Sequence, residues 1–135
     1  MKRRLENMPK HGKIIPNGVV LKEHELSTVV LLTSLGFDVE LIPKSNIKGV
    51  HTPDICISDI LWEIKSPKGE GKSLIKNTLQ KACKQSCNII VDLRRTKRHQ
   101  EKCIAELQRE FAHSKTIKRL KIITKNRGII DWGKE

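Results

Sequence analysis

The spacing of hydrophobic residues changes several times along the chain, and each change marks the boundary of a predicted element. Between about residues 21 and 35 the apolar side chains recur every three or four positions, which predicts an amphipathic helix that stops at Gly36. The next segment, 37–41, alternates apolar and acidic residues with the period of two that a half-buried strand has. Pro43 ends this strand, and a polar linker follows.

Two short β-like runs, 54–58 and 60–66, are separated by so little sequence that we expect them to pair as an antiparallel hairpin around Ser58 and Asp59. A second helix is predicted from about residue 74 to residue 86. The run 89–93 is apolar and β-branched, which is typical of a strand buried on both faces.

A third amphipathic helix is predicted over about 97–113, followed by strands at about 120–124 and 128–132. The elements therefore follow the order helix, three strands, helix, strand, helix and two strands. This order favours an α/β fold of three layers, in which a central mixed β-sheet is flanked by helices.

The 135 residues suffice for one compact domain. Residues 1–18 are basic and rich in proline and glycine, so we expect an irregular N-terminal arm followed by a single folded domain over 19–135. The longest apolar runs are far shorter than a membrane-spanning helix, and the first residues lack the apolar stretch of a signal peptide. We therefore expect a cytoplasmic protein without membrane contact.

Charge points to the class of partner. Lys and Arg number 27 against 15 Asp and Glu, a net charge of +12 that favours a nucleic-acid partner. Much of the excess falls between residues 94 and 127, where twelve basic residues face three acidic ones. The four aromatic residues leave little scope for base stacking, so phosphates should supply most of the affinity. The candidate phosphate contacts are Lys68, Lys72, Arg94, Arg95, Lys97 and Arg98; the alternative for any of them is a solvated surface charge.

Four cysteines occur without a signal for an oxidising compartment, and we interpret them as free thiols. Cys83, Cys87, His99 and Cys103 also have spacings that a zinc site would accept. Because Cys83 and Cys87 fall in a helical pattern beside apolar positions, small buried side chains are the favoured interpretation.

The predicted hairpin gathers the residues that carry chemistry. Glu63 and Lys65 are two positions apart in a strand and project from one face, whereas Trp62 and Ile64 point the other way. Pairing with the preceding strand brings Asp54 within reach of Glu63. Two converging carboxylates beside a lysine predict a site for Mg²⁺, Mn²⁺ or another divalent metal.

Phosphodiester hydrolysis is the chemistry that uses this set. A metal held by Asp54, Glu63 and the Ile64 carbonyl would polarise the scissile phosphate and activate a water, while Lys65 orients that water or stabilises the developing charge. His51, three residues before Asp54, is either a proton shuttle or phosphate contact, or an exposed loop histidine. The alternative for the hairpin carboxylates and Lys65 is a solvated edge with one ion pair.

Pro53-Asp54 followed by Glu63-Ile64-Lys65 resembles the PD-(D/E)XK nuclease signature. More specifically, the chain resembles the tRNA-nuclease toxin domains at the C-termini of CdiA proteins of contact-dependent growth inhibition. The resemblance covers about residues 20–132 and rests on the segments 36–43, 52–54, 62–67 and 82–93.

The resemblance implies a PD-(D/E)XK-like core with Asp54 and Glu63 as metal ligands and Lys65 as the catalytic lysine. It also implies an auxiliary glutamate in the first helix. Glu25 is favoured over Glu23, because Glu25 is in helical phase with Val29 and Leu32; a surface helix charge is its alternative. Gln85, near the end of the second helix, is implied as a polar neighbour of Lys65; solvent exposure or helix capping is its alternative.

We therefore predict a Mg²⁺-dependent endonuclease that cleaves nucleic acid, with tRNA or another RNA as the first substrate and DNA as the second. The alternatives are a catalytically silent nucleic-acid-binding domain and a DNA endonuclease of a mobile element. The resemblance further implies a cognate immunity protein. The sequence leaves the oligomeric state open.

Overall fold

The computed structural model describes residues 10–134, which form three helices and a seven-stranded sheet. The helices are α1 (Glu23–Ser34), α2 (Leu74–Ala82) and α3 (Gln100–His113). The strands are β1 (Ile14–Ile15), β2 (Val39–Leu41), β3 (Ile55–Ile57), β4 (Ile60–Lys65), β5 (Asn88–Asp92), β6 (Arg119–Ile123) and β7 (Ile129–Gly133).

The strands lie side by side in the same order as they occur in the sequence. β2, β3 and β4 form an antiparallel meander, β4, β5 and β6 run parallel, and β7 returns antiparallel to β6. The connections from β4 to β5 and from β5 to β6 contain α2 and α3, and β1 is joined to its parallel neighbour β2 through α1, as parallel crossovers require. The mixed sheet predicted from the sequence is therefore confirmed.

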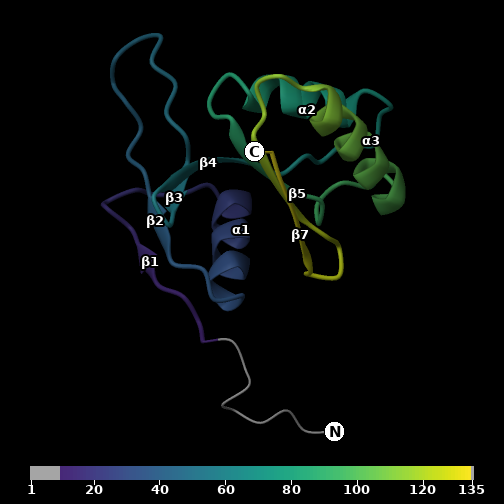
Figure 1. Cartoon of the computed structure of the whole chain (residues 1–135). Coiled ribbons are helices and arrows are strands. Elements are labelled where there is room, and N and C mark those ends of the chain that lie inside the picture. The colour runs from purple at the N-terminus through teal and green to yellow at the C-terminus, as the bar shows by residue number, and fades with distance from the viewer. Residues whose placement is uncertain (1–9, 135) are drawn as a thin grey trace, which may run out of the picture.

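The helices cover opposite faces of the sheet. Alternate residues of β5 separate two hydrophobic clusters: Ile89 and Val91 pack with α2 and α3, whereas Ile90 packs with α1. Figure 1 shows α2 and α3 grouped together, apart from α1. All five residues of β5 are buried, as expected for a central parallel strand. The three-layer prediction is thus confirmed.

The β3–β4 hairpin has the turn that the sequence predicts. Ile57 pairs with Ile60, and both intervening residues, Ser58 and Asp59, have positive φ angles of 49° and 66°. Two positive φ values in a two-residue loop match the twist of the flanking strands. This turn fixes the hairpin register and therefore decides which side chains share a face.

The structure differs from the sequence predictions at the N-terminus. Ile14 and Ile15 lie within the predicted irregular arm, yet they pair in parallel with β2 as an edge strand. Two residues are too few to show a period, so the pattern gave no signal for them. Residues 1–9 of the predicted arm lie outside the described residues. None of the helices described for 10–134 has the length and apolarity needed to cross a bilayer.

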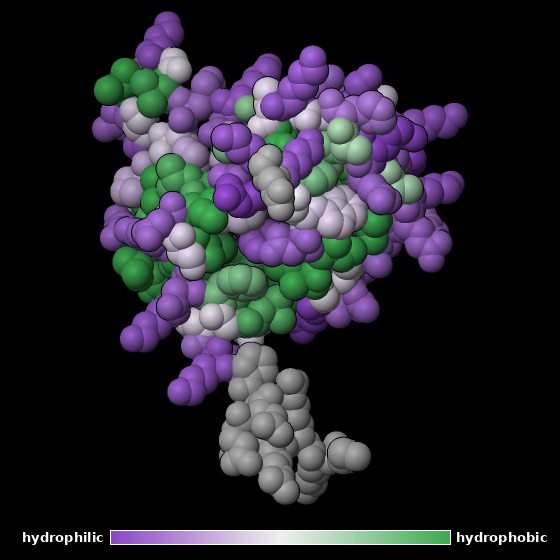
Figure 2. All heavy atoms as spheres, in the orientation of Figure 1, coloured by the Kyte–Doolittle hydropathy of each residue, from purple (hydrophilic) through white to green (hydrophobic). Residues whose placement is uncertain are grey.

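The surface is mostly hydrophilic on the face shown in Figure 2, with apolar atoms gathered in separate patches. One patch is the tip of the long loop between β2 and β3, which projects from the body of the molecule and exposes Ile47 and Val50. The two ends of this loop are joined by the bond from the Ile42 N–H to the Asp54 carbonyl, and we call this region the neck of the loop. It matters for the site because Asp54 belongs to it.

The four cysteines, Cys56, Cys83, Cys87 and Cys103, are free thiols in the structure. Cys103 is fully buried in the α2–α3 cluster, and Cys83 packs against that cluster. Both therefore serve as small apolar side chains in this structure.

Candidate active site

Asp54 is held where β3 begins by main-chain bonds on both sides. Its N–H donates to the Trp62 carbonyl at 3.0 Å, and its carbonyl accepts the Ile42 N–H at 3.0 Å. The carboxylate is buried, and its Oδ2 atom accepts the Ile64 N–H at 2.8 Å. One carboxylate oxygen is thus fixed by the backbone of β4.

Glu63 and Lys65 project from the face of β4 opposite to Trp62 and Ile64, which pack in the α1 cluster. The Lys65 Nζ lies 3.3 Å from Glu63 Oε2. The Glu63 side chain is only 3% exposed, whereas that of Lys65 is 26% exposed. The sequence prediction of a carboxylate and an ammonium on one face is confirmed.

Gln85 also meets the Glu63 carboxylate, from the end of the turn that follows α2. With its amide nitrogen turned toward Glu63, Gln85 donates to Oε1 at 2.8 Å and also contacts Oε2. A carboxylate accepts only, so the nitrogen is the atom that belongs on this side. The polar neighbour that the family resemblance implied thus bonds Glu63, the partner of Lys65.

The electrostatics of the pair follow from burial and charge. Burial, followed by the charge and hydrogen bonding of Asp54, raises the pKa of Glu63 to about 7, while Lys65 acts in the opposite direction. Two carboxylates held together in a buried place repel each other when both are ionised. Such a pair needs a cation or a proton.

Lys44 supplies a cation that sequence reasoning missed. Its Nζ lies 2.6 Å from Asp54 Oδ1 and 3.3 Å from the Thr52 carbonyl. Both contacts close the neck of the β2–β3 loop, where the Ser45 N–H also bonds the Thr52 hydroxyl at 3.2 Å. No periodic pattern marks Lys44, because its position depends on how the loop folds back.

A cavity of about 240 Å³ opens beside Glu63 and Lys65. It is lined by Lys22, His24, Glu25, Glu63, Ile64, Lys65, Ser66, Pro67, Thr78 and Lys81. The cavity is therefore bordered by α1, β4 and α2 and carries basic side chains around the buried Glu63. The Ser66 hydroxyl is buried and has no hydrogen-bond partner among residues 10–134.

Glu25 lines this cavity and Glu23 does not, which agrees with the choice made from helical phase. Its Oε1 atom accepts the Lys22 N–H at 3.2 Å and so caps the start of α1. Glu23 instead lines a separate hollow of about 370 Å³ with His24, Ser27, Lys68 and Arg95. His24 belongs to both cavities and connects them.

The remaining candidates fall into two groups. His51, Lys72 and Lys97 are exposed and line neither of these cavities. Arg98 is engaged in an ion pair with Glu106, whose oxygen lies 2.7 Å from the guanidinium, and is mostly buried. The basic cluster predicted at 94–98 therefore combines surface charges with internal ion pairs.

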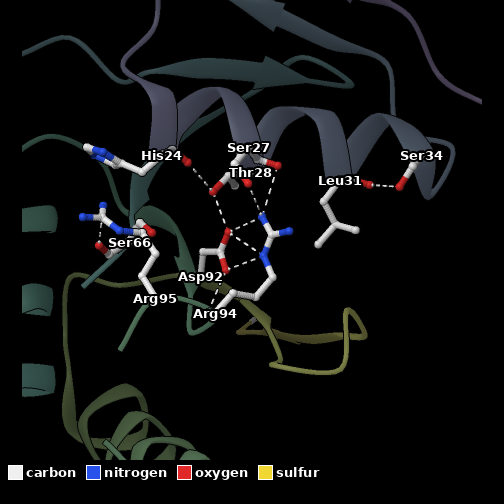
Figure 3. Close-up of polar contacts among 9 residues, drawn as sticks. All are labelled: His24, Ser27, Thr28, Leu31, Ser34, Ser66, Asp92, Arg94 and Arg95. Carbon is white, nitrogen blue, oxygen red and sulfur yellow. Dashed lines mark hydrogen bonds and ion pairs between the residues drawn. The ribbon is translucent and has the colours of Figure 1, made fainter. Parts of the chain in front are cut away.

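Arg94 is the second internal member of that cluster. Its guanidinium bonds both oxygens of the buried Asp92, as well as the carbonyl and hydroxyl of Ser27 in α1 (Figure 3). Burial alone would raise the pKa of Asp92, but the hydrogen bonds from Arg94 and Thr28 outweigh it and lower that pKa. Arg94 thus joins β5 to α1, and its guanidinium is already occupied by protein partners.

The donor set of the site suits a hard divalent cation. Asp54 and Glu63 offer carboxylate oxygens, and the Ile64 carbonyl lies on the same side of β4 as the N–H that bonds Asp54, as strand geometry requires. The Lys44 ammonium already takes a cation's place at Asp54 Oδ1. Within 10–134, no three His, Cys, Asp or Glu side chains form a metal-binding group.

Comparison with known proteins gives a consistent result. The family model for the contact-dependent growth inhibition CdiA C-terminal domain matches residues 51–129, which is more than half of the chain. Among solved structures, the chain resembles a CdiA-CT/CdiI toxin and immunity complex from Burkholderia pseudomallei with a TM-score of 0.68. That alignment covers 91% of this chain and 100% of the other at 16% identity, so it shows a shared fold. No curated protein sequence matches the chain.

Proposed function

Since the chain belongs to the family of the contact-dependent growth inhibition CdiA C-terminal domain, we propose that it is a toxin domain that hydrolyses phosphodiester bonds in nucleic acid with the help of a divalent metal. The observation that carries the proposal is the pairing of two buried carboxylates, Asp54 and Glu63, beside Lys65. Glu63 and Lys65 also line a cavity with basic walls. Packing alone gives no reason to bury such a pair.

Each residue has a defined role in this proposal. A bound Mg²⁺ or Mn²⁺ ion would polarise the scissile phosphate and lower the pKa of a water. Asp54, Glu63 and the Ile64 carbonyl would hold it. Lys65, fixed by its ion pair with Glu63, donates to the attacking water or to the phosphate oxygens as they gain charge. Gln85 keeps the Glu63 carboxylate oriented.

Nucleic acid is the substrate class that the charge of the chain supports. The net charge is +12, and the two cavities that meet at His24 bear Lys22, Lys81, Lys68 and Arg95 along their walls. Such a track would bind successive phosphates of a strand. We propose RNA, with tRNA first, as the substrate and DNA as the second candidate; the preference for RNA rests on the family resemblance. The toxin domain would act in the cytosol, where tRNA is found.

A cognate immunity protein is the partner that we propose. The similar solved structure is a toxin and immunity complex. An acidic protein that covers the basic cavities would block access to Glu63 and Lys65 and would gain affinity from complementary charge.

The test is to incubate the protein with total RNA, tRNA and plasmid DNA in Mg²⁺ or Mn²⁺, with and without a chelator. We expect metal-dependent cleavage that Glu63→Gln slows by about 10²-fold or more. Glu101→Gln is the matched control, because Glu101 is an exposed residue of α3 and the substitution changes the charge equally. Binding of nucleic acid without cleavage under any of these conditions would instead support the silent binding domain.

A further inference from the structure

The loop that joins β2 to β3 delivers a lysine to the metal ligands, although nothing in the catalytic signature requires one there. Lys44 and Asp54 are ten residues apart, and the Ile42 N–H bonds the Asp54 carbonyl at 3.0 Å, so the two ends of the loop meet at this point. The Lys44 Nζ is held by both Asp54 Oδ1 and the Thr52 carbonyl. The contact is thus a product of the closed loop neck.

The two oxygens of Asp54 have different partners among the described residues. The Oδ2 atom accepts the Ile64 N–H, whereas the Oδ1 atom meets a cation from outside the strand pair. Lys44 lies 2.6 Å from Oδ1. An ammonium at that distance and a divalent ion bound to the same oxygen would repel each other strongly in a buried site.

Lys44 approaches the carboxylate from the solvent side. The Lys44 side chain is 57% exposed while that of Asp54 is 3% exposed. Lys44 therefore reaches in from solvent and has space to withdraw, whereas Asp54 has none.

We propose that Lys44 is an internal cation that balances the Asp54 and Glu63 carboxylates in the metal-free protein and is displaced when a divalent metal binds. The inference rests on the proposed metal-dependent function. Its consequence is a protein that stays folded without metal and that binds metal more weakly than its carboxylates would allow.

The experiment compares Lys44→Met with wild type by calorimetric titration with Mn²⁺ and Mg²⁺ and by thermal melting. Lys48→Met is the matched control, because Lys48 is an exposed residue of the same loop with no hydrogen bond or ion pair to any described residue. We expect Lys44→Met to bind metal about tenfold more tightly and to melt at a lower temperature without metal. Lys48→Met should leave both quantities close to wild type.

A double mutant identifies the partner. In an Asp54→Asn background, Lys44→Met should no longer lower the metal-free melting temperature, because the pair has already been broken. Lys44→Gln provides a second, polar replacement that keeps the hydrogen bond to Thr52 available if the apolar methionine disturbs the loop.

The outcomes separate this inference from the proposed function. Equal metal affinity in wild type and both Lys44 variants would overturn the role of Lys44 and leave the metal-dependent function standing. Absence of metal binding in wild type and in both variants would overturn the metal site itself and the displacement with it.

Discussion

The Thr28 hydroxyl of α1 donates a hydrogen bond of 2.6 Å to Asp92 Oδ2 at the end of β5, although 64 residues separate them in the chain. The same carboxylate is bonded by Arg94, which reaches on to Ser27 (Figure 3). Four side chains therefore bind α1 to the central strand. The orientation of α1 in turn sets where Glu25 and His24 border the active-site cavity.

Removal of Arg94 should destabilise the fold. Arg94→Met leaves the buried Asp92 carboxylate without its cation, a loss worth about 3 kcal/mol of unfolding free energy. Arg95→Met is the matched control, because Arg95 is exposed and bonds only the Ser66 carbonyl, at 3.3 Å, among the described residues. Urea unfolding of both variants measures the difference. Equal stabilities would show that the Asp92 network contributes nothing to holding α1 in place.

The exposed basic residues of the segment 94–98 should contribute to nucleic-acid binding. Charge reversal at Arg95 and Lys97 should reduce the slope of log affinity against log salt by about 0.7–0.9 for each lost phosphate contact. Filter binding with tRNA over a range of salt concentrations gives the slope. If it stays unchanged in the double variant, this part of the surface does not face the nucleic acid.

Stability of the metal-free protein should depend on the protonation of Glu63. Its pKa is about 7 in the folded protein against an ordinary value of 4.5, so the folded state keeps a proton that the unfolded chain releases. The unfolding free energy should therefore fall as pH rises from about 4.5 to about 7 and then level off. Glu63→Gln should remove this fall, so that it melts above wild type at pH 8 but not at pH 4.

Melting curves at several pH values provide the measurement, with Glu101→Gln as the exposed control. A constant difference between Glu63→Gln and wild type from pH 4 to pH 8 would contradict the raised pKa.

The catalytic assignments predict two kinds of result among three variants. Asp54→Asn and Glu63→Gln should fold, bind Mn²⁺ weakly and cleave substrate slower by about 10²-fold or more. Lys65→Ala should cleave as poorly but keep its affinity for metal, because Lys65 is assigned to the water and the phosphate. Calorimetry combined with cleavage assays separates binding from chemistry. Wild-type cleavage by any of the three would remove that residue from the mechanism.

The cysteines should be dispensable for activity but not equally replaceable. Cys56, Cys83 and Cys87 are partly exposed and should accept serine with little loss of stability. Cys103 is fully buried among apolar side chains, so alanine should be tolerated there better than serine, whose hydroxyl would lose its water. Thermal melting ranks the variants, and metal analysis of the purified protein tests for zinc. Stoichiometric zinc that is lost on substitution of Cys83 or Cys87 would instead support a zinc site at these cysteines.

Local pattern determined most of the secondary structure of this protein. The helical period over α1, the alternation before Leu41 and the short spacing between β3 and β4 each involve only neighbouring residues, whose geometry is set by the backbone. Because a two-residue turn fixes the register of its hairpin, the sequence also placed Glu63 and Lys65 on one face and brought Asp54 to them.

Tertiary structure alone decided which charges meet. Asp54 pairs with Lys44 across a folded-back loop, Asp92 with Arg94 and with the Thr28 hydroxyl of α1, and Arg94 turns inward while Arg95 stays outside. The strand pairing of Ile14 and Ile15 likewise depends on β2 lying beside them. Whether a cation contacts a carboxylate depends on the distance between them in space, and that distance depends on how loops close and layers pack. The period of a helix or strand is instead set by neighbouring residues in the chain.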